Sequence, residues 1–131
     1  MKFPNIHTLV SSLFIAGLLS ACGGGGDAAA GSPTAFSVVP SSTTFTAPVG
    51  TPAGVCLGGG TTQVFIYGGA APYQINNTVP AYVSVDKTTV SDRGGSFTIT
   101  VIGGCLTTGL VTVVDKLNNI TNFTVNNKPA G

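Results

Sequence analysis

The chain has 131 residues and a formal net charge of +1, and only 7% of its residues are charged, against roughly 25% in an average globular domain. A protein that neutralises nucleic-acid phosphates carries a clear excess of Lys and Arg, and this chain has none. The composition therefore argues against nucleic acid as a partner.

The N-terminus has the order of segments that is typical of a secretory signal peptide. Lys2 supplies a positive charge, and an apolar run over residues 9–19 follows it. The run is too short to cross a bilayer, which needs roughly 20 apolar residues. A buried core helix is the alternative, but the four glycines after Cys22 are unfavourable for a helix that continues past this point.

At the end of this run, Leu19-Ser20-Ala21-Cys22 place a Leu three positions before a Cys with small residues between them. This motif resembles the lipobox of bacterial lipoproteins. The resemblance implies that residues 1–21 are removed and that Cys22 is acylated, which anchors the chain in a membrane. Gly23 follows the Cys where an Asp would favour retention at the inner membrane, so the resemblance implies the cell envelope, and within it the outer membrane.

Residues 22–33 then form the lipidated cysteine and a linker rich in Gly and Ala. Gly-rich segments behave as flexible coils, and eleven residues of this kind span on the order of 20 Å. We expect the linker to hold the following domain just clear of the lipid headgroups.

If Cys22 is lipidated, two cysteines remain, Cys56 and Cys105. An exported protein meets an oxidising compartment, where a pair of cysteines favours a disulfide. Two buried free thiols are the alternative. A zinc site is unsupported, because the mature chain has no His and no CxxC spacing.

From Thr34 onward, short β-prone runs alternate with Gly, Pro, Asn and Asp. The clearest run is 96–101, where Phe97, Ile99 and Val101 alternate with polar residues as in a half-buried strand. A first strand is interrupted by Pro40, and the last two strands flank a hairpin turn with Asn118 or Asn119 at its tip. The other predicted strands cover residues 61–67, 73–75, 81–85, 109–114 and 120–125.

This pattern predicts an all-β protein, a single antiparallel β-sandwich over residues 34–127 with a short tail at 128–131. The Gly68-Gly69 strand end, Ala71-Pro72-Tyr73, the Phe-Thr-Ile-Thr-Val strand and Val-Thr-Val-Val-Asp before the last turn resemble the immunoglobulin-like domains of bacterial surface proteins. The chain lacks the glycine usual after that Asp. The resemblance implies that Cys56 and Cys105 meet at one edge of a sheet and do not bridge the core.

Catalytic residues are scarce. The single histidine, His7, lies in the predicted signal peptide, and the chain has no Glu, so Ser/His/Asp and Cys/His sites are excluded from the mature chain. Asp86 and Asp92 are best interpreted as turn residues, and a calcium site using them with Asp115 lacks a run of closely spaced ligands. We expect no enzyme activity, no cofactor and no metal.

Three tyrosines, Tyr67, Tyr73 and Tyr82, surround the segment 68–81 and are candidates for a recognition edge. The sequence therefore predicts a non-enzymatic, membrane-anchored immunoglobulin-like module for adhesion or for interaction with a cell-envelope protein. Two alternatives stay open. One is a module that binds a small ligand or a glycan, and the other is an accessory subunit of an envelope complex.

Overall fold

The computed structural model describes residues 35–131. The predicted signal peptide, Cys22 and the predicted linker lie outside the described residues. The described part is all-β, with nine strands and no helix. The strands are β1 (Ser37–Val39), β2 (Ser42–Thr46), β3 (Thr61–Tyr67), β4 (Tyr73–Asn77), β5 (Val83–Val85), β6 (Thr89–Val90), β7 (Ser96–Val101), β8 (Leu106–Val114) and β9 (Ile120–Lys128).

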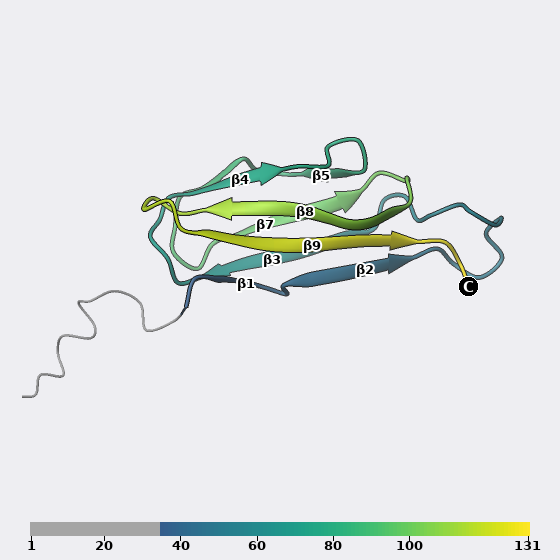
Figure 1. Cartoon of the computed structure of the whole chain (residues 1–131), viewed down its shortest axis with the longest axis horizontal. Coiled ribbons are helices and arrows are strands. Elements are labelled where there is room, and N and C mark those ends of the chain that lie inside the picture. Colours follow the sequence, from purple (N-terminus) through teal and green to yellow (C-terminus); the bar gives the residue numbers. More distant parts are fainter. Residues whose placement is uncertain (1–34) are drawn as a thin grey trace, which may run out of the picture.

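The strands form two layers, as Figure 1 shows. One sheet has the order β1-β3-β7-β5 and the other has the order β2-β9-β8-β4-β6. Every strand pair is antiparallel except β2 with β9, which run parallel. The prediction of a β-sandwich is confirmed, and its description as antiparallel throughout is corrected at this one pair.

The core lies between the two sheets and follows the alternation in the sequence. In β7, Phe97, Ile99 and Val101 are buried while Thr98 and Thr100 between them are not. A strand turns successive side chains to opposite faces, so one face of β7 packs inward and the other meets solvent. The same alternation in the other long strands completes a core that includes Val64, Ile66, Ile75, Val111, Val113, Phe123 and Val125.

The first predicted strand is divided between the two sheets. Before Pro40, β1 pairs with β3, and after it β2 pairs with β9. Proline lacks the N–H that a continuous ladder would need, so the chain changes sheets here. The split prediction is confirmed, and each half forms one edge of its sheet.

Strand boundaries differ from the prediction mainly at the ends. The short strand β6 was not predicted, because Thr89 and Val90 are too few to show an alternation. Strand β9 runs to Lys128, and Pro129 forms an isolated bridge with Cys56. The predicted tail 128–131 therefore begins too early, since its first two residues belong to the folded domain.

The two ends of the sandwich carry different features. At one end, which we call the N-terminal end, the described chain begins beside the loops 68–72, 91–95 and 115–119 (Figure 1). The other end, which we call the disulfide end, carries the loop 47–60, the segment 102–105 and the C-terminus. Among the described residues, no helix is long and apolar enough to span a membrane.

Candidate functional site

At the N-terminal end, the carboxylate of Asp115 organises the turn between β8 and β9. Asp115 is only 4% exposed. Its Oδ1 accepts hydrogen bonds from the backbone N–H groups of Leu117 and Asn119, both at 2.8 Å. Its Oδ2 accepts bonds from the backbone N–H of Ala70 and from Nδ2 of Asn119, both at 3.0 Å. Both carboxylate oxygens are thus used within the protein, and the group holds the 68–72 loop against the hairpin.

The hydrogen bonds control the ionisation of Asp115. Burial alone would raise the pKa of this carboxyl group. The side-chain and backbone donors of Asn119, with the backbone N–H groups of Ala70 and Leu117, favour the charged form and outweigh burial. The pKa of Asp115 is therefore lowered below its ordinary value of 3.8.

We expect the lowered pKa of Asp115 to make the domain sensitive to acid. The folded state binds a proton at this site less readily than the unfolded state, so the stabilisation is complete above the ordinary pKa and is lost as the pH falls through the folded-state value. Thermal unfolding of wild type from pH 7 to pH 2 should show this loss of stability.

Asp115→Asn is the matched variant. The amide nitrogen of the new side chain would face the N–H of Ala70, and two donors cannot form a hydrogen bond with each other. The variant should therefore have a lower free energy of unfolding than wild type at pH 7. Because it cannot ionise, its stability should change less than that of wild type below pH about 4. Parallel pH profiles for the two proteins would contradict a dominant role for Asp115.

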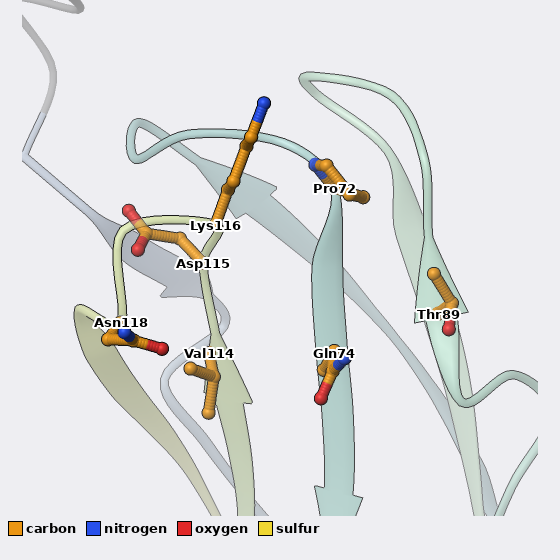
Figure 2. Close-up of a pocket in the computed structure, with 7 residues that line it drawn as sticks. All are labelled: Pro72, Gln74, Thr89, Val114, Asp115, Lys116 and Asn118. Atoms are coloured by element: carbon orange, nitrogen blue, oxygen red, sulfur yellow. The ribbon is translucent and has the colours of Figure 1, made fainter.

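A shallow pocket of about 280 Å³ lies on the outer face of the five-stranded sheet at the same end. Figure 2 shows Gln74 of β4 with Val114 of β8 on one side and Thr89 of β6 on the other. Lys116 extends away from the sheet. The carboxylate of Asp115 points away from these side chains, toward its own turn. Pro72 and Asn118 complete the lining.

At the disulfide end, Cys56 and Cys105 are bonded, with their Cα atoms 5.1 Å apart. Cys56 precedes β3 and Cys105 follows β7, and these two strands are antiparallel neighbours in one sheet. The bridge therefore joins two segments at one end of this sheet, as expected, and the alternative of two free thiols is wrong.

Buried Asn127 reinforces this end. Its Nδ2 donates to the carbonyl oxygens of Leu57, at 2.8 Å, and Gly104, at 3.0 Å. Its Oδ1 accepts from the N–H of Leu57 at 3.3 Å. Leu57 follows Cys56 and Gly104 precedes Cys105 in the chain. The side chain of Asn127 therefore binds both segments that the disulfide joins.

The loop between β2 and the disulfide consists of two consecutive tight turns. The N–H of Thr51 donates to the carbonyl of Pro48, and the N–H of Val55 donates to that of Pro52, both at 3.1 Å. The third residue of each turn is a glycine with positive φ, +97° and +80°. This geometry is that of type II turns, which favour Gly at the third position. Val49, at the second position of the first turn, is 98% exposed.

The three tyrosines do not form one recognition edge. Tyr73 is fully buried, its ring stacks on Phe36 with centroids 5.9 Å apart, and its hydroxyl donates to the carbonyl of Gly68 at 2.7 Å. Burial raises the pKa of Tyr73, with Arg93 opposing and Asp115 adding to the rise. Tyr73 is therefore a core residue, and the prediction that it belongs to a recognition edge is wrong.

Tyr67 and Tyr82 are both partly exposed, but they lie at opposite ends of the same sheet. Tyr67 ends β3 at the N-terminal end, whereas the carbonyl of Tyr82 accepts from Ile102, just beyond the far end of β7. The six residues of β7 between these points span about 20 Å. Tyr67 and Tyr82 are therefore not neighbours, and no single loop presents both of them.

The described residues contain no group of three His, Cys, Asp or Glu side chains that could hold a metal ion. Asp86, one of the predicted turn residues, accepts a hydrogen bond from the N–H of Thr98 at 2.7 Å. Both carboxylate oxygens of Asp115 already accept hydrogen bonds from its own turn and from Ala70.

Most of the pocket residues, Asn127 and the double turn were not singled out from the sequence. The pocket residues come from different strands, and only the register of β4 with β6 and β8 brings Gln74, Thr89 and Val114 into one row. In the sequence, Asn127 cannot be distinguished from the neighbouring Asn residues, and nothing local indicates that it is buried. The double turn did have a local signal, because Pro48-Val49-Gly50-Thr51 and Pro52-Ala53-Gly54-Val55 repeat one turn pattern.

Comparisons with protein families, with curated proteins and with solved structures find no match to this chain.

Proposed function

We propose that this protein is a non-enzymatic bacterial lipoprotein, anchored through Cys22, whose immunoglobulin-like domain binds a protein partner in the cell envelope. One observation carries the proposal: the described chain begins at one end of the sandwich, and the disulfide-braced loop 47–60 lies at the other (Figure 1). An anchor before residue 35 would leave the disulfide end free to meet a partner.

The immunoglobulin-like assignment is supported by the strand arrangement. The first strand is shared between both sheets, and β3 and β7 are antiparallel neighbours. The residues that carry the resemblance also gather in one place. A Cβ atom added to Gly69 would lie 2.6 Å from the Phe36 ring and 3.1 Å from Oδ2 of Asp115, and Phe36 stacks on Tyr73.

A protein-binding role fits the side chains better than a site for a small ligand or a glycan does. The pocket has no aromatic ring on which a sugar could stack, and its volume of about 280 Å³ lies at the lower end of the range for ligand sites, roughly 300–1,000 Å³. Protein recognition by contrast uses exposed apolar side chains on a rigid support. The braced loop offers Val49 and Val55, which are 98% and 46% exposed.

The anchor is tested by acyl labelling in cells. Wild type should incorporate a labelled fatty acid and fractionate with membranes, because the Cys22 thiol is the proposed acylation site. Cys22→Ala should lose the label, and its signal peptide should stay uncleaved. Label retained by Cys22→Ala would defeat the lipoprotein proposal.

The partner is tested by crosslinking in intact cells, with a photo-crosslinking amino acid incorporated in place of Val49. The same amino acid in place of Gln74 is the matched control. Both side chains are exposed, but Val49 lies at the disulfide end and Gln74 at the N-terminal end. We expect a discrete crosslinked protein from position 49 and none from position 74. The reverse result would show that the binding surface lies at the N-terminal end, against the proposal.

A further inference from the structure

The tip of the β8–β9 hairpin exposes two large aliphatic side chains at the N-terminal end, one in the turn and one at the start of β9. Leu117 is 69% exposed and Ile120 is 62% exposed. Ile120 is paired directly with Val114, which lines the pocket, and Lys116 lies beside Leu117. We call Val114, Lys116, Leu117 and Ile120 the hairpin-tip surface.

The fold does not require a leucine at position 117. The turn uses the backbone N–H of Leu117, which donates to Asp115, and the left-handed backbone of Asn118 at φ +67°. A polar side chain at position 117 would leave both features in place, and the side chain itself is mostly in solvent. Its apolar character is therefore unexplained by the packing of this domain.

The hairpin-tip surface lies beside the point where the chain would arrive from a lipid anchor. Phe36 is one residue from the start of the described chain, and a Cβ atom on Gly69 would touch both its ring and Oδ2 of Asp115, the first residue of the turn. The disulfide end lies about 30 Å farther from this point, because β8 and β9 each have nine residues and run side by side between the two ends.

We propose that the hairpin-tip surface contacts the bilayer in which the chain is anchored, with Leu117 and Ile120 entering the interfacial region. This inference rests on the proposed lipidation of Cys22. It replaces the expectation that the linker holds the domain clear of the headgroups, because a flexible linker also allows the domain to reach the bilayer. The transfer of aliphatic side chains from water to the membrane interface is favourable, and an added contact of this kind strengthens a lipid anchor. The ammonium of Lys116 stays at the level of the headgroup phosphates while its methylenes pack alongside. The disulfide end then points away from the membrane.

The chain has no tryptophan, so one introduced Trp reports on its own position alone. Leu117→Trp and Val49→Trp form a matched pair, since both side chains are largely exposed and lie at opposite ends. The full-length lipoproteins are purified from membranes and reconstituted into vesicles of phosphatidylethanolamine and phosphatidylglycerol. The same vesicles are then made with lipids brominated on the acyl chains, which quench nearby Trp.

We expect the emission of Leu117→Trp to shift to shorter wavelength on reconstitution and to lose intensity with brominated lipid, while Val49→Trp keeps its aqueous emission. Equal behaviour of the two variants, or quenching of Val49→Trp alone, would overturn the inference. Flotation with the vesicles separates the two proposals. If Leu117→Trp floats but its emission is not quenched, only the membrane contact is defeated, whereas a protein that does not float defeats the anchor as well.

Discussion

Loss of the Cys56–Cys105 disulfide is expected to lower the free energy of unfolding by about 4 kcal/mol. The bridge closes a loop with a sequence separation of 49, and a crosslink of that length restricts the unfolded chain by roughly this amount in the loop-entropy model. Domains of this size have total stabilities of roughly 5–15 kcal/mol, so the bridge should supply between about a quarter and most of the stability. Urea unfolding with and without a reducing agent measures the difference.

Serine variants check that the loss comes from one shared bridge. Cys56→Ser and Cys105→Ser should each lose a similar amount, and the double variant should be little worse than either single variant, because the second substitution breaks nothing further. Cys56 is buried and Cys105 is exposed, so any extra cost of a buried hydroxyl should appear in Cys56→Ser alone. A double variant far less stable than both singles would mean that the two cysteines act independently.

Tyr73→Ala is the second change with a large expected effect, a loss of about 3–5 kcal/mol, which is typical when a buried aromatic side chain is truncated to Ala. Tyr73 is fully buried and stacked on Phe36, so its removal would leave a cavity at the N-terminal end of the core. Urea unfolding of the variant and wild type measures the loss.

Two comparisons separate the contribution of the Tyr73 ring to stability from that of its hydroxyl and from that of a more exposed tyrosine. Tyr73→Phe keeps the stacked ring and removes the bond to the carbonyl of Gly68, so it should cost about 1 kcal/mol. Tyr67→Ala, at a 43% exposed position, should cost about 0.5 kcal/mol or less. A loss for Tyr67→Ala equal to that for Tyr73→Ala would contradict the assignment of Tyr73 alone to the core.

Much of the fold could be predicted because strand signals are local. The alternation of Phe97, Ile99 and Val101 with threonines marks one buried face with period two, and β7 has the predicted bounds. Pro40 marks the point where the first strand divides, since proline cannot donate to a ladder. Asn118 was one of two residues named for the tip of the last hairpin, and it has the left-handed backbone that such turns favour.

The candidate sites could be predicted less well, because they depend on strands that pair over long distances in the sequence. Spacing alone placed the three tyrosines around one segment, but burial of Tyr73 and the length of β7 separate them. The parallel pairing of β2 with β9 joins segments about 80 residues apart, and nothing in either strand specifies its direction.

The longer strands, their turns and the pair of cysteines could be predicted from the sequence, because side-chain alternation, proline and glycine act on their own few residues. Tertiary structure decided which side chains share a surface. It brought the start of the domain beside the β8–β9 turn, buried Asp115 among four donors and placed the braced loop at the opposite end. These relations follow from sheet register and layer packing, in which each residue's neighbours come from strands far away in the chain.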